Sequence, residues 1–316
     1  MKEFNIPSEE SGQKLLRFLN RILPEAGNGL LHKMLRKKNI TINGKKCTGN
    51  EELSEGDSVK IFFSDETFLK FTGKSTNFDS DYIDSLLKLN TNDIEILYES
   101  EDIVCINKKP GMLSQKSSED DVSANELLIA YLFKNDKINS ETLKTFKPSV
   151  INRLDRNTSG ILIFGKTMKG IKYGTEALKN NDIRKTYKCI VKGIYSGPEI
   201  MEGYLSKDED NNYISYSSSQ VPDSKYMKQE VMVDSESNGY SCLTVTLHTG
   251  RSHQIRSSLS YYGNPIIGDV KYGDKNLNNK LHVKRPLLHS YSCIIEGNLI
   301  IAPEQEDFIK FKEKYL

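Results

Sequence analysis

The side chains best suited to chemistry surround Asp155, which stands between Arg153 and Arg156. An opposite charge within a few ångströms favours the ionised form of a carboxyl group, so Asp155 suits a nucleophile better than a proton donor. The polar residues 157–160 predict a turn, and residues 161–164 predict a short apolar strand. An ordinary ion pair across a loop is the alternative, and this segment alone favours that alternative.

Two later segments carry side chains that suit the same site. Residues 183–193 alternate as a strand, so Lys185 and Tyr187 share one face and a phenol lies beside cationic groups. Residues 249–256 are dense in polar residues and end on Arg256. The five histidines show no paired ligand spacing. The sequence therefore offers no cluster of metal ligands.

Composition places the chain among ordinary soluble proteins. At 316 residues, with 28% charged and 37% hydrophobic residues, it is long enough for two domains. No segment approaches the roughly 20 apolar residues of a membrane span, and residues 1–10 lack the apolar core of a signal peptide. Five scattered cysteines without C-x-x-C spacing argue against disulfides and a thiolate metal site. We expect a cytoplasmic protein with no membrane partner.

The net charge of +1 hides an uneven distribution. Residues 30–47 carry six basic residues and no acid, and residues 65–102 hold ten acids against three lysines. Residues 150–196 return to ten basic residues against three acids. Two basic blocks separated by an acidic one indicate a polyanion partner that is bound at two places. Solvated charged faces would give the same composition.

The first sixty residues predict a small α+β unit. Residues 12–23 and 29–38 have apolar side chains at helical spacing. Residues 40–46 predict a hairpin with basic residues at its tip, because an Asn-Gly pair sits between two short strand-like runs. A further strand is expected at residues 58–63.

Two small helices followed by a basic hairpin resemble the alpha-L RNA-binding module of the ribosomal small-subunit protein four. In that module the second helix and the loop after it contact the RNA backbone, and such contacts position the protein without reading sequence. The alternative is a small α+β cap with a solvated lysine face. The resemblance implies the RNA-binding residues Lys33, Arg36, Lys37, Lys38 and Lys45.

These patterns divide the chain into three parts. Residues 1–66 form the alpha-L-like RNA-binding domain, and residues 67–92 form an acidic linker with one or two helical turns. Residues 93–316 form a second, larger domain. Its strand-like and helical segments are interspersed, and periodicity alone supports only an α+β class.

Three segments of the second domain occur in an order typical of one enzyme family. Together they resemble the RluA-type pseudouridine synthases, the group that contains RluC and RluD, over about residues 93–303. Each alone is weak evidence, but all three in order are specific. The segments are Arg153-Leu-Asp155-x-x-Thr158-Ser-Gly160, then Lys185-Thr-Tyr187 before Val191-Lys-Gly193, then Thr249-Gly-Arg251-Ser-His253-Gln-Ile-Arg256 with Gly263-x-Pro265-Ile-x-Gly268-Asp269.

The resemblance implies both a fold and a reaction. The fold is α+β, with a mixed, mainly antiparallel catalytic sheet flanked by helices. The reaction converts uridine to pseudouridine in structured RNA, and large-subunit ribosomal RNA is the expected substrate. It breaks the bond from N1 of uracil to the ribose, turns the base, and joins C5 to the same sugar carbon. Members of this family need no cofactor or metal, and we expect RNA as the partner and a monomeric protein.

The resemblance also implies roles for the matched side chains. Asp155 is the nucleophile, at the sugar carbon or at C6 of the ring, once the uridine has left its stack. Arg153 occupies the space left by the base, and Tyr187 lies against the uracil. Arg256 pairs with Asp155 and with a substrate phosphate. The plainer alternatives are that Tyr187 is a strand tyrosine half in the core, and that Arg256 caps a helix or binds a structural acid. Arg156 has no assigned role.

Three positions depart from the family pattern. Asn152 stands where histidine is usual, Ser258 stands where a histidine often follows, and residues 107–111 contain an extra lysine. None of these is the nucleophile, so we expect activity with an altered fit to RNA. Two other function classes stay open: a ribosome-assembly protein that binds RNA without catalysis, and a glycosidase or nucleosidase that uses Asp155. Hydrolysis would call for a second carboxylate, and no motif supplies one.

Overall fold

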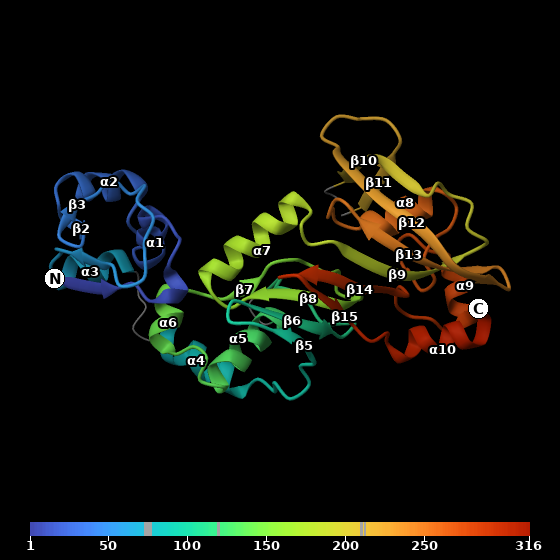
Figure 1. Cartoon of the computed structure of the whole chain (residues 1–316), viewed down its shortest axis with the longest axis horizontal. Coiled ribbons are helices and arrows are strands. Elements are labelled where there is room, and N and C mark those ends of the chain that lie inside the picture. The colour runs from blue at the N-terminus through green and yellow to red at the C-terminus, as the bar shows by residue number, and fades with distance from the viewer. Residues whose placement is uncertain (73–77, 119–120, 209–210, 212) are drawn as a thin grey trace.

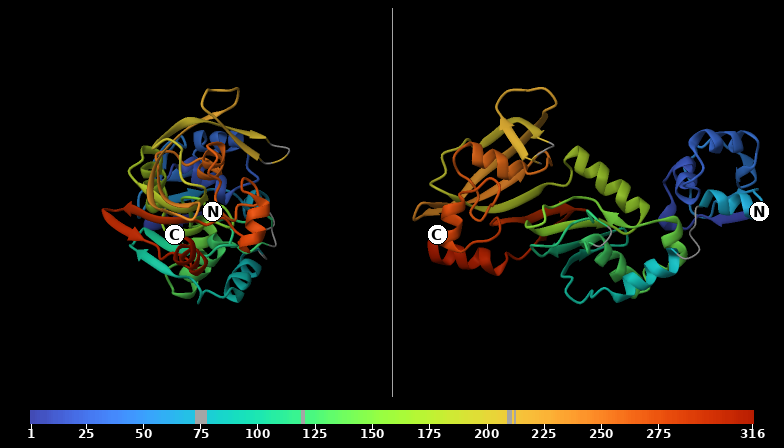
Figure 2. Two further views of the ribbon diagram at one scale, coloured as in Figure 1. Left: turned by 90° about the vertical axis from the view of Figure 1, so that its right-hand side faces the viewer. Right: turned by 180° about the vertical axis from the view of Figure 1, so that it is seen from behind.

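Two β-sheets organise the chain. The computed structural model describes residues 1–72, 78–118, 121–208, 211 and 213–316. The molecule is elongated, and the N-terminal unit lies at one end of its long axis (Figure 1). Seen from behind, the N-terminal unit again stands apart at one end, joined to the rest along the chain (Figure 2).

The N-terminal unit is a small antiparallel sheet that packs on two helices. Its strand order is β1-β4-β2-β3. In α1 (Leu15–Ile22) and α2 (Asn28–Arg36) the apolar residues at helical spacing are buried, as the sequence predicts. Strand β1 was not predicted from the sequence, because most of its residues are exposed at the edge of the sheet. The strands are β1 (Lys2–Asn5), β2 (Ile40–Ile42), β3 (Lys45–Lys46) and β4 (Ser58–Ile61), and a short 3-10 helix, η1 (Ser8–Glu10), follows β1.

The acidic segment 67–92 contains more helix than the sequence pattern indicates. Helix α3 (Asp65–Thr72) packs Phe68 and Phe71 against the N-terminal core. Helix α4 (Phe78–Lys88) buries Leu86 in the main core of the second unit. These contacts with distant segments supply the stabilisation that the weak apolar periodicity did not reveal. Residues 73–77, which also belong to the predicted linker, lie outside the described residues.

The described residues of the second unit form one eleven-stranded sheet, in the order β11-β10-β12-β13-β9-β14-β8-β6-β5, with β7 beside β8 and β15 beside β14. Most pairings are antiparallel, and β14 runs parallel to β8, which confirms the predicted α+β class with a mixed sheet. The strands are β5 (Ile96–Glu99), β6 (Ile103–Lys108), β7 (Ser149–Val150), β8 (Ser159–Gly165), β9 (Lys185–Lys192), β10 (Ile200–Asp208), β11 (Tyr213–Ser217), β12 (Lys225–Ser237), β13 (Tyr240–Leu247), β14 (Leu288–Ile295) and β15 (Asn298–Ile301).

Helices cover both faces of this sheet. Every residue of β8 is buried. Its alternate side chains Leu162 and Phe164 share a core with α5, whereas Ile161 and Ile163 share one with α7. A strand covered on both faces reads as a continuous apolar run, which is what residues 161–164 show. The helices are α5 (Ala124–Lys134), α6 (Ser140–Thr145), α7 (Met168–Asn180), α8 (Gln254–Tyr261), α9 (Lys275–Leu281) and α10 (Glu306–Tyr315).

The junction of β8 and β14 lies directly after the Asp155 turn. Gly160 has a φ of +104°, and a Cβ at this position would lie 2.1 Å from the Ser290 carbonyl oxygen. Only glycine allows the two backbones to approach so closely. Gly160 therefore fixes where β8 begins, and with it the end of the loop that carries Asp155.

We expect Gly160→Ala to lower the free energy of unfolding by roughly 2–4 kcal/mol, because it combines left-handed backbone strain with a backbone clash. Gly297→Ala is the matched control, since Gly297 has a φ of +75° but nothing within 4 Å of its Cβ position. It should cost only about 1 kcal/mol. Chemical denaturation measures both values, and equal losses would contradict the close approach.

Candidate functional site

Asp155 lies in the loop between β7 and β8, and backbone contacts hold this loop in place. The Leu154 N–H donates to Ser114 Oγ at 3.0 Å, and the Ser114 hydroxyl donates back to the Leu154 carbonyl at 2.9 Å. After the aspartate, the Thr158 N–H donates to the Asp155 carbonyl at 3.0 Å and closes the predicted turn. The Asp155 side chain remains 31% exposed. A fixed backbone with an accessible carboxylate suits attack on an external substrate.

A buried lysine ties this loop to the segment after β6. Lys108 is fully buried, and its ammonium group donates to the carbonyl oxygens of Lys109, Met112 and Arg156 at 3.1, 2.9 and 3.1 Å. Burial lowers the pKa of Lys108 to about 7, against an opposing effect of the neighbouring aspartate. Arg156 adds a bond from Nε to the Gly111 carbonyl at 3.0 Å. The basic loop and Arg156, which had no role on sequence grounds, both hold the carboxylate loop.

Arg256 lies between two carboxylates. Its Nη1 donates to Asp155 Oδ2 at 2.7 Å, so the predicted pair is present. Its Nε and Nη2 donate to the two oxygens of Asp269 at 2.7 and 2.9 Å. Asp269 is fully buried and also accepts the N–H groups of Lys271 and Tyr272. Burial raises the pKa of Asp269, but the guanidinium and these N–H donors lower it by more, so the net pKa lies below its ordinary value. Asp269 therefore stays ionised and fixes the position of Arg256.

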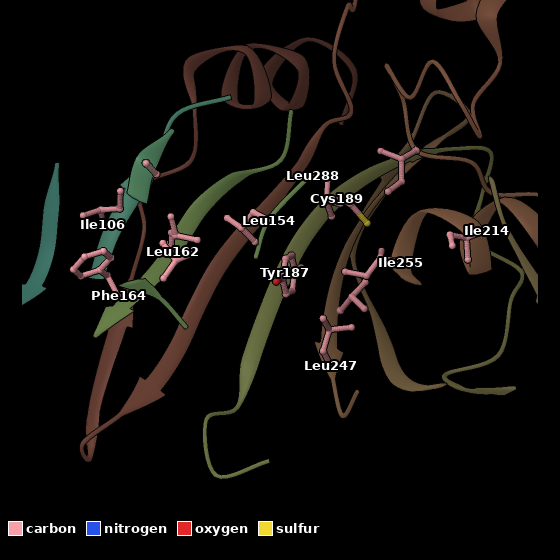
Figure 3. Packing of buried hydrophobic residues seen from close by; sticks show 14 of the residues in the cluster. Ile106, Leu154, Leu162, Phe164, Tyr187, Cys189, Ile214, Leu247, Ile255 and Leu288 are labelled. Atoms are coloured by element: carbon pink, nitrogen blue, oxygen red, sulfur yellow. The ribbon is translucent and has the colours of Figure 1, made fainter. Parts of the chain in front are cut away.

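Tyr187 lies on the apolar side of the site. It projects from β9 among buried residues that include Leu154, Leu247 and Leu288 (Figure 3). Only 6% of Tyr187 is exposed, although it lines the cleft that contains Asp155. Burial raises the pKa of Tyr187 to about 12, with Ser290 opposing and Asp155 reinforcing the shift. The phenol is therefore protonated near neutral pH.

His253 belongs to the third sequence motif, but the sequence predicted no role for it. Its Nδ1 lies 2.8 Å from the Tyr272 hydroxyl oxygen, which also accepts the Ile214 N–H at 3.0 Å. Since that hydroxyl has one proton to donate, we assign the neutral ring, with Nδ1 as acceptor and the proton on Nε2. Burial lowers the pKa of His253, which favours the same form. Nε2 faces Asp155 Oδ1 at 3.9 Å, so a donor points toward the free side of the carboxylate.

One basic cleft of about 1020 Å³ is lined by Asp155, Tyr187, His253 and Arg256. Within the described part of the chain, Asp155 is the acidic residue among its lining side chains. Arg153 is exposed on its wall. A cleft with this charge concentrates polyanions. The basic residues on its walls include Arg153, Arg156, Lys179, Lys185, Arg251 and Arg256.

Two of the departures from the family pattern have structural explanations. Asn152 is buried, and its side-chain oxygen accepts the Ile163 N–H at 2.7 Å, so it extends the pairing of β8. Ser258 is buried in α8, where its hydroxyl donates to the Gln254 carbonyl at 2.9 Å and accepts from Gln229 at 3.0 Å. Asn152 lies on the cleft wall, and Ser258 does not.

The predicted N-terminal RNA-binding residues form a separate surface. They lie on α2, in the turn after it and on β3, and all five are exposed. None of them lines the cleft. No carboxylate within ion-pair distance is found for them among the residues that the structure describes. They are Lys33, Arg36, Lys37, Lys38 and Lys45.

The described residues hold no group of three or more His, Cys, Asp and Glu side chains that could bind a metal. Within the same residues, no helix has the length and apolar composition to cross a membrane.

We expect Asp269→Asn to lower the free energy of unfolding by about 3 kcal/mol at neutral pH, because it leaves a buried guanidinium without its main partner. Asp307→Asn removes a carboxylate from Arg285, but the Asp307 side chain is 49% exposed. This matched control should change stability by about 1 kcal/mol or less. Denaturant unfolding measures both, and equal effects would contradict the buried pair.

The pH dependence of the Asp269→Asn effect has a definite sign. A carboxylate whose folded-state pKa is lowered stabilises the protein above its ordinary pKa, which is 3.8 here. The stability difference between wild type and Asp269→Asn should therefore be constant near neutral pH and shrink as pH falls below that value. A difference that grew on acidification would contradict an ionised Asp269.

Comparisons with known proteins identify the family of the chain. The family model for RNA pseudouridylate synthase matches residues 102–261. A ribosomal large subunit pseudouridine synthase D of Borreliella burgdorferi is 31% identical over 242 residues, covering 76% of this chain and 70% of the relative. An uncharacterized RNA pseudouridine synthase of Mycoplasma genitalium is 29% identical over 306 residues, covering 92% and 88%.

A solved structure shows the same fold at low sequence identity. The human RNA pseudouridylate synthase domain containing 4 superposes with a TM-score of 0.56 at 16% identity, and the match covers 74% of this chain and 95% of the human chain. The sequence motifs had suggested this enzyme family, and the family model and relatives confirm it. The chain belongs to the RNA pseudouridylate synthase family.

Proposed function

We propose that this enzyme converts uridine to pseudouridine in structured large-subunit ribosomal RNA, with Asp155 as the nucleophile. The arrangement of the Asp155 carboxylate carries the proposal. Arg256 binds Oδ2, whereas Oδ1 faces the cleft near His253 and Tyr187 lines the same space. The name of the Borreliella burgdorferi relative, a ribosomal large subunit pseudouridine synthase, supports the choice of RNA.

The proposed reaction balances with a single carboxylate. Attack of Asp155 on C1′ of the ribose forms an ester as the bond from C1′ to N1 breaks, and the electron pair stays on the uracil. After the base turns, C5 attacks C1′ and the ester electrons return to the carboxylate. Loss of a proton from C5 and gain of one at N1 complete the product. In the second version, the carboxylate adds to C6 as the C5–C6 π electrons move toward O4, and the C1′–N1 bond then breaks. After C5 has joined C1′, the carboxylate leaves C6, and loss of the C5 proton with gain of one at N1 restores the C5–C6 double bond.

The surroundings of Asp155 suit each requirement of this reaction. Arg256, held by the buried Asp269, orients the Asp155 carboxylate. Tyr187 offers an aromatic face to a base that has left its stack. Because its pKa is raised to about 12, its hydroxyl suits contact with the uracil better than unaided proton abstraction. Arg153 is exposed at the cleft, as a side chain that fills the gap in the RNA must be.

Hydrolysis of a glycosidic bond fits the cleft less well. Hydrolases of this kind use two carboxyl groups, one as nucleophile or base and one as acid. Among the described lining residues, Asp155 stands alone as an acid, and both oxygens of the nearby Asp269 are bound by Arg256. Release of free uracil from RNA would favour the hydrolase.

We expect Asp155→Asn to lower pseudouridine formation in ribosomal RNA at least about 1000-fold, because the isosteric amide is a poor nucleophile. RNA affinity should change by less than about threefold, since phosphate contacts dominate binding. Pseudouridine mapping of RNA from cells with each variant measures activity, and a filter-binding titration measures affinity. Asp93→Asn, at an exposed aspartate, is the control. Unchanged modification would refute the nucleophile, and unchanged modification together with unchanged RNA binding and growth would favour the assembly protein without catalysis.

We also propose that the N-terminal unit is an alpha-L RNA-binding domain. Its helix order and basic hairpin follow the expected pattern. The five predicted RNA-binding side chains, Lys33, Arg36, Lys37, Lys38 and Lys45, are exposed and have no ion-pair partner among the described residues, so their charges are available to RNA phosphates.

Replacing Lys37 and Lys38 together by Ala should reduce the slope of log affinity against log salt concentration by roughly 0.7–0.9 for each phosphate contact that is lost. Lys275 and Lys280, both exposed at α9, provide a control pair with the same change in charge. The experiment measures RNA binding over a series of salt concentrations. An equal slope for wild type and the Lys37/Lys38 variant would assign these lysines to a solvated face.

A further inference from the structure

Lys185 is a cationic side chain on the wall of the cleft that no step of the proposed reaction uses. It begins β9, two residues before Tyr187, and it lines the same cleft as Asp155. Successive residues of a strand rise by about 3.3 Å, so the two Cα atoms are separated by about 7 Å. Residues two apart on a strand point to the same face, so the Lys185 side chain lies on the same side of β9 as Tyr187, about the length of one nucleotide from the expected position of the base.

The Lys185 ammonium has no carboxylate partner and no hydrogen-bond acceptor within the described residues. Other partly or fully buried cations of this domain are matched. Lys188, on the same strand, faces Asp234 and Glu304, and Lys108 is bound by three carbonyl oxygens. Burial lowers the pKa of Lys185, against a smaller opposing effect of the Cys293 thiol. An unmatched, partly desolvated cation favours an anion supplied from outside.

A glycine leaves the Lys185 ammonium accessible from the cleft. Gly250 is exposed in the loop between β13 and α8, and a Cβ at this position would lie 3.3 Å from Lys185 Nζ. A larger side chain would compete with a ligand for the space around the ammonium. The loop thus approaches the lysine without covering it.

The only acid of the cleft, in the part of the chain that the structure describes, is Asp155, which is already bound by Arg256. The remaining anions available in an RNA complex are the phosphodiesters of the RNA backbone. A lysine binds a phosphate as a point charge and imposes little geometry, which suits a backbone that must bend while a base leaves its stack.

We infer that Lys185 is a binding site for one RNA phosphodiester next to the target uridine. The inference rests on the proposed function only for the position of the uridine. The contact uses the charge that the folded protein leaves unmatched, so the lysine is a binding residue and takes no part in bond breaking.

The first test compares stability with RNA binding. Lys185→Met keeps the length of the side chain and removes the charge. It should weaken binding of a short single-stranded oligouridine and reduce the salt slope by about 0.7, while the midpoint of unfolding stays the same or rises. Lys185→Arg should restore the slope. Lys192→Met is the control, because Lys192 ends the same strand but pairs with Asp274 at 2.8 Å.

The second test identifies the chemical group that is bound. Acylation of individual lysines, followed by mass spectrometry, reports how accessible each amine is. The oligouridine should slow acylation of Lys185 several-fold, whereas an oligouridine with neutral methylphosphonate linkages should not, and Lys310, exposed on α10, should react equally in all samples.

Two outcomes would overturn the inference. Equal protection by the neutral oligomer would mean that Lys185 contacts a base or sugar, and a Lys185→Met variant that loses stability but keeps its salt slope would make the lysine structural. The test is separate from that of the nucleophile. Asp155→Asn should leave the protection of Lys185 unchanged, so loss of the proposed reaction and loss of the phosphate contact are distinguishable.

Discussion

The site depends on the placement of Arg256 between a buried carboxylate and an accessible one. Asp269 binds two nitrogens of the guanidinium and is itself fixed by backbone N–H groups, so Arg256 cannot turn away. The third nitrogen then determines where Asp155 Oδ2 must lie. A bidentate pair of this kind is both strong and directional. The Asp155 carboxylate of the cleft is thereby held in a position that leaves its other oxygen free for substrate.

The second constraint is the attachment of the Asp155 loop on both sides. Ser114 binds the backbone before the aspartate, and the Lys108 ammonium binds the backbone after it. Burying a lysine carries a desolvation cost, which its three carbonyl acceptors offset. At Lys185, by contrast, no acceptor among the described residues offsets this cost, and a bound anion would relieve it. Replacing Lys185 by an uncharged residue would remove this desolvation cost and stabilise the fold, but RNA binding would then be weaker.

The sequence predicted which residues meet in the cleft better than it predicted the residues that hold them in place. Asp155, Tyr187 and Arg256 meet as expected, because three ordered motifs identified them together. Asp269 belonged to a quoted motif, but no local pattern reveals that an aspartate will be fully buried against a distant arginine. The sequence marked residues 107–111 only by an extra lysine and did not reveal that Lys108 is buried, since lysine is rarely buried and its partners here are backbone atoms. Helices α3 and α4 were underestimated because their stability comes from contacts with segments distant in sequence.

The structure of this enzyme bound to an RNA hairpin that it modifies would test the central claim most directly. The target uridine should lie outside its helix with the uracil against Tyr187, Asp155 Oδ1 should face C1′ or C6, and Arg256 should keep both of its carboxylates. A uridine that remains stacked in the RNA, or one whose sugar and ring lie beyond the reach of Asp155, would contradict the assignment of Asp155 as the nucleophile.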